Sequence, residues 1–143
     1  MKVRLDTLPG IVRTVLARLP DKKNRAVIVG LIGELGAGKT TFVQALAKEL
    51  EIAETVQSPT YVLMKRYEVS NQKFKYLVHI DAYRLSGPEE FKALKPETFL
   101  NDPRALVVVE WPERIMGALP PPDMTIRFSS EDASPEERYI EVV

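Results

Sequence analysis

Apolar positions recur with a helical period in two stretches of this chain. The first follows Asp6 and Thr7, a pair able to cap a helix, and it predicts a helix that runs to about Leu19. The second covers residues 40–50. Its apolar face consists of Phe42, Leu46 and Leu50, with Val43 and Ala47 beside them. Both helices therefore present an apolar face that can pack against a sheet.

Short apolar runs rich in β-branched residues predict the strands. Residues 26–32 and 105–109 are almost continuously apolar, which is typical of strands buried on both faces. Residues 61–69 and 74–80 are separated by a short polar segment, and this arrangement predicts an antiparallel hairpin.

The second half of the chain completes the predicted sheet. Residues 124–128 and 138–143 are expected to pair as closing strands near one edge. A helix is expected to begin at Pro88, because proline followed by acidic residues suits a first turn. Strands alternate with helices early and pair as hairpins later, which predicts an α/β fold with a mixed, mainly parallel central sheet flanked by helices.

Composition narrows the class of protein. A length of 143 residues suits one domain, so residues 1–143 are expected to form a single domain. The 20 basic and 20 acidic residues cancel, which argues against an autonomous nucleic-acid binder. The chain has no cysteine, so disulfides, zinc–thiolate sites and thiol nucleophiles are excluded. Apolar runs are too short to span a bilayer, so we expect a cytoplasmic protein without membrane contact.

A phosphate-binding loop follows the first buried strand. Residues 33–40 match G-x-x-x-x-G-K-[ST] at every fixed position, between a predicted strand and a predicted helix. Glycines let backbone N–H groups turn inward toward phosphate oxygens, and the following helix directs its positive end at the same anion. The residues predicted to bind ATP are Gly33, Glu34, Leu35, Gly36, Ala37, Gly38, Lys39 and Thr40, with Thr41 as a further contact.

Within this loop, two side chains have specific chemistry. Lys39 is expected to place its cation on the β- and γ-phosphates and so to take part in catalysis. The hydroxyl of Thr40 is expected to ligate Mg²⁺. The sequence therefore predicts a P-loop NTPase domain that uses ATP and Mg²⁺.

Two acids end apolar runs that predict strands. Ligands of open α/β sheets bind beyond the carboxyl ends of the strands, so Asp81 and Glu110 can both face the γ-phosphate. Glu110 ends the more continuously apolar of the two predicted strands and is the first choice as a ligand of Mg²⁺. Asp81 is then the catalytic candidate that orients the attacking water or accepts its proton. The pattern leaves open an exchange of these two roles.

Three other residues near the predicted site are less decisive. Thr60 lies between the loop helix and the hairpin, where it can act as a switch that senses the γ-phosphate, or sit in a plain turn. His79, the only histidine, is expected to be a hydrogen-bonded strand residue rather than a catalytic group. Trp111 can pack against the nucleotide, the core or a partner.

Taken together, these motifs resemble the TsaE family of small bacterial ATPases. The matching segments, in order, are residues 33–42, Ser58-Pro59-Thr60-Tyr61, His79-Ile80-Asp81-Ala82-Tyr83-Arg84-Leu85 and Glu110-Trp111-Pro112-Glu113. The first segment is shared by many ATPases. Its combination with the segments that begin at His79 and at Glu110 is specific to this family.

The resemblance implies an activity and a set of partners. It implies ATP hydrolysis in support of TsaB- and TsaD-type proteins, which form threonylcarbamoyladenosine beside the tRNA anticodon, with tRNA reached through the complex. It also implies that Thr40 and Glu110 hold Mg²⁺ and that Asp81 supports hydrolysis. Arg138 corresponds to a family arginine near the nucleotide.

Two other functions remain open from the sequence. A small P-loop kinase shares the loop, but it needs a pocket and a basic lid, for which only Lys65, Arg66 and Arg84 are candidate cations. A nucleotide-dependent interaction module would bind ATP with little or no hydrolysis. ATP turnover by the chain alone, with its partners and with a phosphate acceptor distinguishes the ATPase, the kinase and the interaction module.

Overall fold

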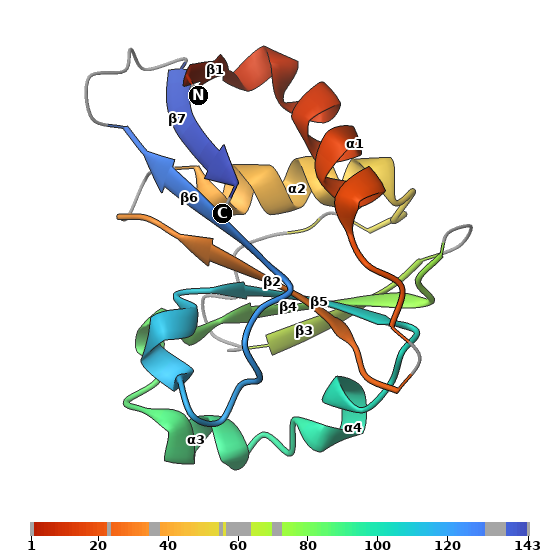
Figure 1. Ribbon diagram of the computed structural model, residues 1–143, viewed down its shortest axis with the longest axis vertical. Coiled ribbons are helices and arrows are strands. Elements are labelled where there is room, and N and C mark those ends of the chain that lie inside the picture. The colour runs from red at the N-terminus through yellow and green to blue at the C-terminus, as the bar shows by residue number, and fades with distance from the viewer. Residues whose placement is uncertain are drawn as a thin grey trace.

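A computed structural model shows a seven-stranded sheet with helices on both faces (Figure 1). It describes residues 2–22, 24–34, 38–54, 56, 64–69, 73–130 and 137–142. The strands are β1 (Lys2–Arg4), β2 (Val27–Ile32), β3 (Met64–Glu68), β4 (Tyr76–Asp81), β5 (Ala105–Glu110), β6 (Met124–Ser129) and β7 (Glu137–Val142). The helices are α1 (Leu8–Arg18), α2 (Lys39–Glu49), α3 (Pro88–Lys92) and α4 (Glu97–Leu100), and the 3₁₀ turns are η1 (Leu5–Thr7), η2 (Ala82–Arg84) and η3 (Pro112–Ile115).

The sheet is mixed, with a parallel centre. Its order is β1-β7-β6-β2-β5-β4-β3, and the four strands β6, β2, β5 and β4 run parallel to one another. The antiparallel pair β3 and β4 confirms the predicted hairpin, and the pair β6 and β7 confirms the closing strands. β1, which the sequence did not reveal, pairs with β7 and forms the edge. The predicted α/β class with a mixed sheet is therefore confirmed.

Alternate strand residues face two separate core layers. In β5, Leu106 and Val108 pack in the layer that includes residues of α1 and α2, whereas Val107 and Val109 pack in the layer beneath α3 and α4. Figure 1 shows the helices on these two sides of the sheet. Because both faces are covered, the central strands are apolar along their whole length.

The start of α1 differs from the expected cap. The helix itself is confirmed, but Thr7 makes no side-chain hydrogen bond to the first turn. Its hydroxyl donates instead to the carbonyl oxygen of Arg4 at 2.8 Å. The turn η1 comes directly before the helix, and it uses the threonine side chain that a capping interaction would need.

Strand register brings the two predicted acids together. Asp81 and Glu110 are paired residues at the carboxyl ends of the parallel strands β4 and β5, and Leu31 of β2 pairs with Glu110 on the other side. These ends meet at one edge of the sheet, where α2 begins after the phosphate loop. Within the described part of the chain, no helix has the length and apolar character needed to cross a membrane.

Candidate nucleotide site

The turn that leaves β2 requires glycine at residue 33. Gly33 has a φ of 155°, and a Cβ added there would lie 2.6 Å from the carbonyl oxygen of Phe128. Phe128 belongs to β6, the strand beside β2. The backbone can therefore pass this close to β6 only without a side chain.

We expect Gly33→Ala to lower the free energy of unfolding by about 1–3 kcal/mol, because alanine is strained at this φ and meets a backbone atom. Chemical denaturation measures the change. Gly10→Ala is the matched control, since its Cβ would meet only Arg13 at 3.8 Å in an α1 position that favours alanine by about 0.5–1 kcal/mol. A Gly33→Ala protein as stable as the wild type would contradict the close approach.

Lys39 lies at the start of α2 and is buried. Gly38 precedes it as the helix N-cap in a left-handed conformation. The Lys39 ammonium donates to the carbonyl oxygen of Gly33 and lies 3.8 Å from the ring centroid of Trp111. Burial lowers the pKa of Lys39, and the negative charge of Glu110 opposes that shift. The cation is thus held over the turn where the phosphates are expected.

Thr40 and Glu110 face each other across the site. The hydroxyl of Thr40 is 3.4 Å from each carboxylate oxygen of Glu110. Glu110 is only 4% exposed, and its Oε2 lies 2.6 Å from Nε2 of the fully buried His79. The carboxylate is therefore held between a strand histidine and the first turn of α2.

Asp81 stands beside this group and is half-buried. Its Oδ1 accepts a hydrogen bond from the backbone N–H of Tyr83 at 3.0 Å, at the start of η2. Burial raises the pKa of Asp81, and the neighbouring Glu110 charge adds to the rise, against the lowering effect of the Tyr83 hydrogen bond. The structure thus brings Lys39, Asp81 and Glu110 close enough for their charges to interact.

The raised pKa of Asp81 gives a stability prediction with a defined sign. The folded chain binds this proton more tightly than the unfolded chain, so the contribution of Asp81 to stability is lost as the pH rises through its raised pKa. Asp81→Asn carries no such loss. We expect the stability of the variant relative to wild type to increase from pH 4 to pH 8 in denaturation experiments. If the difference in stability between Asp81→Asn and wild type is the same at pH 4 and pH 8, burial of the Asp81 charge is contradicted.

The oxygen groups at this site fit a magnesium ion. Among the described residues there is no cluster of three or more His, Cys, Asp or Glu side chains suited to a metal. Mg²⁺ bound with a nucleotide needs only one or two protein oxygens, because phosphates and water complete its octahedron. Neighbouring ligands at 2.0–2.1 Å from Mg²⁺ lie about 2.9 Å apart, so the 3.4 Å between Thr40 and Glu110 requires little movement.

Comparisons with known proteins identify the family of this chain. The family model described as "Threonylcarbamoyl adenosine biosynthesis protein TsaE" matches residues 11–140. The chain belongs to the TsaE family. A relative from Haemophilus influenzae, named tRNA threonylcarbamoyladenosine biosynthesis protein TsaE, is 33% identical over 90% of this chain and 76% of its own length. A protein of the same name from Streptomyces coelicolor is 38% identical over 80% of this chain and 78% of its own length.

A solved structure supports the same fold. The crystal structure of Bacillus subtilis YdiB superposes with a TM-score of 0.65 and 26% sequence identity, and the match covers 98% of this chain and 82% of that chain. The P-loop fold with a mixed sheet, predicted from the strand and helix pattern and the phosphate-loop motif, is therefore confirmed.

Glu34 and Thr41, two of the residues predicted to bind ATP, have side-chain neighbours away from Lys39. The Glu34 carboxylate accepts hydrogen bonds from the backbone N–H and hydroxyl of Ser130, which lower its pKa. Thr41 is exposed on α2 and lines a hollow of about 610 Å³ with Leu8, Pro9 and others. These contacts point Glu34 toward the end of β6 and Thr41 toward the side of α2 that faces α1.

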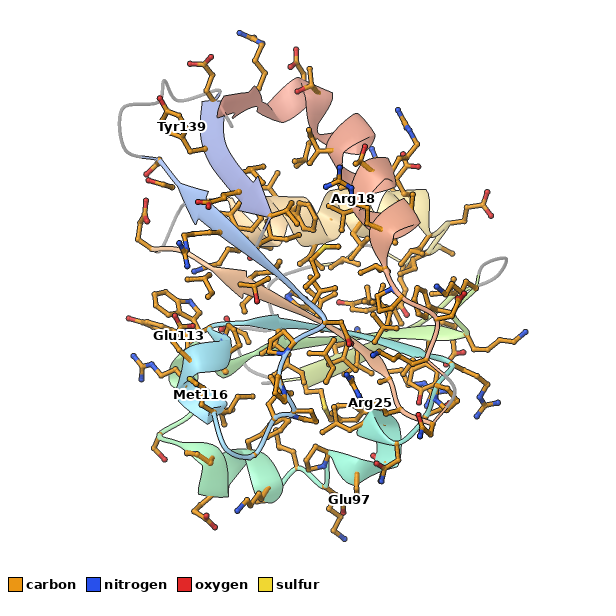
Figure 2. The ribbon with its side chains drawn as sticks, viewed as in Figure 1. Arg18, Arg25, Glu97, Glu113, Met116 and Tyr139 are labelled. Atoms are coloured by element: carbon orange, nitrogen blue, oxygen red, sulfur yellow. The ribbon has the colours of Figure 1, made fainter. Side chains whose placement is uncertain are left out.

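Some predictions for this TsaE-family chain lie outside the described residues. These are Leu35, Gly36, Ala37 and Thr60, together with the side chain of Arg138. A second hollow, of about 720 Å³, lies under η3 among Pro112, Leu119 and Pro122. Its rim residues Glu113 and Met116 project outward in Figure 2. Lys39, Thr40 and Asp81 line neither of these two hollows.

Sequence reasoning missed two contacts at this TsaE-family site. Trp111 has a positive φ of 62°, which turns its ring under the Lys39 ammonium and 5.1 Å from the Tyr83 ring. His79 was correctly expected to be a hydrogen-bonded strand residue, but its partner Glu110 was not identified. The spacing places His79 and Asp81 on the same face of a strand, but the contact with Glu110 follows only from the register in which Asp81 pairs with Glu110.

Proposed function

We propose that this chain binds ATP with Mg²⁺ between the first turn of α2 and the carboxyl ends of β4 and β5, and hydrolyses it in support of tRNA threonylcarbamoyladenosine formation. One observation carries the proposal. Segments far apart in sequence meet here, since Thr40, next to Lys39 at the start of α2, lies 3.4 Å from Glu110, and Glu110 pairs with Asp81 across β5 and β4. Membership of the TsaE family supplies the pathway.

Lys39 binds the phosphates by exchanging its present partners. Its ammonium is buried, and it contacts the Gly33 carbonyl oxygen and the Trp111 ring. Both partners are weaker than a triphosphate for a buried cation, because charge-assisted hydrogen bonds to phosphate are about twice as strong as neutral ones. The lysine is therefore positioned in advance and gains its strongest partner from the nucleotide.

Thr40 and Glu110 provide the protein ligands of the metal. Their oxygens face one another at 3.4 Å, and hard oxygen ligands of this kind suit Mg²⁺. Mg²⁺, when bound, neutralises charge on the β- and γ-phosphates. Glu110 takes this role rather than Asp81, because Thr40 contacts Glu110 and the Asp81 carboxylate is turned to the Tyr83 N–H.

Asp81 orients the attacking water and accepts its proton. A general base works best when its pKa approaches the working pH, and burial moves the pKa of Asp81 in that direction. The Tyr83 N–H fixes one carboxylate oxygen, and the other, which accepts no hydrogen bond from the described residues, can bind a water molecule. The 3₁₀ turn η2 thereby positions the base.

Partners complete the function. We propose that TsaB- and TsaD-type proteins raise the turnover of this ATPase, and that tRNA is reached through their complex because the chain has a net charge of zero. We also propose that residues 1–143 work as one P-loop domain, since one sheet joins strands from Lys2 to Val142.

The test is phosphate release from ATP by the purified chain, with Mg²⁺ or EDTA, and with or without TsaB- and TsaD-type proteins. We expect slow Mg²⁺-dependent release that the partners increase. Turnover that requires an added phosphate acceptor would establish a kinase instead. For that alternative, Lys65 and Arg66 are already engaged, by Glu54 at 3.7 Å and Glu68 at 3.0 Å. Binding without release under all conditions would establish an interaction module.

ATP is also expected to change the emission of Trp111, the only tryptophan. The Lys39 ammonium leaves the indole ring when it moves to phosphate, so the environment of the ring changes. A fluorescence titration measures this, and adenosine, which has no phosphate, is the control ligand. Unchanged emission at ATP concentrations shown by calorimetry to saturate the protein would contradict the exchange of partners.

A further inference from the structure

The buried histidine of β4 has a structural partner but no part in the function derived so far. His79 is fully buried and is the only histidine in the chain. Its Nε2 lies 2.6 Å from Oε2 of Glu110, while Nδ1 has no hydrogen-bond partner among the described residues. A buried polar ring with a single partner at a functional site calls for an explanation.

We propose that His79 is a positioning residue that fixes the metal-binding carboxylate of Glu110, an inference that rests on the proposed role of Glu110 toward Mg²⁺. The unpartnered Nδ1 determines the tautomer. A buried N–H without an acceptor is rarely found, so the proton resides on Nε2, and Nε2–H donates to Oε2. His79 is then a fixed donor behind the carboxylate.

This bond divides the two oxygens of Glu110 between two tasks. Oε2 is held by His79, whereas Oε1 has no hydrogen bond from that ring, and the Thr40 hydroxyl lies 3.4 Å from both oxygens. Oxygen ligands of metals are commonly oriented by such outer hydrogen bonds. Oε1 is therefore the oxygen presented to the metal, directly or through a water molecule.

The same bond keeps Glu110 away from the phosphate-binding lysine. Lys39 is close enough for the charge of Glu110 to affect its pKa, yet its ammonium contacts Gly33 and Trp111. A carboxylate released from His79 can turn to the Lys39 ammonium, because a buried charge favours an opposite charge. That ion pair would occupy both the metal ligand and the phosphate ligand.

Strand geometry makes the arrangement rigid. His79 pairs with Val108 and Asp81 pairs with Glu110, so the histidine lies one same-face position behind the two acids. The ring is enclosed, with no exposed surface, and its strand β4 is hydrogen-bonded on both sides, to β5 and to β3. A donor on such a strand holds its partner more precisely than a loop residue does.

The test compares His79→Asn with His79→Gln in the full-length chain. The two side chains differ by one methylene, and only the glutamine amide reaches the position of Nε2. Affinity for the β,γ-imido analogue of ATP is measured by calorimetry in EDTA and in saturating Mn²⁺. The dissociation constant in EDTA divided by the dissociation constant in Mn²⁺ gives the contribution of the metal to binding, independently of turnover.

We expect His79→Asn to lower this ratio by about tenfold or more, with unchanged affinity in EDTA, and His79→Gln to restore most of it. His79→Asn added to Glu110→Gln should cause no further loss. An unchanged ratio in folded His79→Asn, or an equal fall in both variants, overturns the proposal. If circular dichroism shows that His79→Asn is unfolded, His79→Leu is measured by the same criterion.

Glu110→Gln separates this inference from the proposed function. If Glu110→Gln leaves the metal contribution intact, the proposed metal role of Glu110 fails, and the role of His79 fails with it. If Glu110→Gln removes the metal contribution while His79→Asn retains it, only the positioning role of His79 fails.

Discussion

Replacing Asp81 by asparagine is expected to lower ATP turnover by about 10²-fold or more while leaving nucleotide affinity nearly unchanged. Asparagine keeps the acceptor for the Tyr83 N–H, so η2 retains its position. It cannot accept a proton from water, and the contribution of a general base is lost. Single-turnover phosphate release measures the chemical step, and calorimetry with the non-hydrolysable analogue measures affinity.

Asp21→Asn is the matched control for this change. Asp21 pairs with Lys73 in the loop before β2, at the end of the strand opposite to the phosphate site. It should retain wild-type turnover. If Asp81→Asn also retains it, Asp81 is not the base. If Asp81→Asn instead loses the metal contribution to binding, Asp81 and Glu110 have exchanged roles.

Lys39→Ala is expected to weaken ATP binding by about 10- to 100-fold, because one charge-assisted hydrogen bond contributes about 1.5–3 kcal/mol. The side chain is buried at the start of α2, and its present partners are the Gly33 carbonyl oxygen and the Trp111 ring. Among the residues that the structure describes Lys39 has no salt bridge, so its removal deletes the phosphate ligand without breaking one. Calorimetry at fixed ionic strength measures the loss.

The matched control for Lys39→Ala is Lys92→Ala on α3. Lys92 is exposed and forms a surface pair with Glu89 at 3.3 Å, an interaction that contributes little. ATP affinity should be unchanged in this variant. Equal affinity of Lys39→Ala and wild type would show that the lysine does not bind phosphate, and the site would then need another cation.

The parts of the structure that the sequence predicted best are those with local signals. The strand before Gly33 and the helix after it show clear periodicity, and the buried faces of α2 match the expected Phe42, Leu46 and Leu50. By contrast, β1 spans only Lys2–Arg4, too short for any period to appear, and its place depends on pairing with β7. Distant pairing of this kind leaves no local trace.

The residues of the site show the same difference between local sequence signals and contacts made between distant segments. Lys39 and Thr40 belong to a contiguous motif whose spacing follows from phosphate geometry. Asp81 and Glu110 were recognised because each ends an apolar run. The contact between His79 and Glu110 depends on the register of β4 against β5, and the place of Trp111 depends on one left-handed backbone angle. Neither can be predicted from residue types and spacing alone.

The central claim is that the phosphate site of this chain serves formation of threonylcarbamoyladenosine. The most direct test measures this nucleoside in tRNA from a bacterium depleted of its own TsaE and supplied with this chain or with its Lys39→Ala variant. We expect the wild-type chain to restore the modification and Lys39→Ala, at equal protein level, to fail. Restoration by both proteins would contradict the role of the phosphate site, and failure of a folded wild-type chain would contradict the pathway.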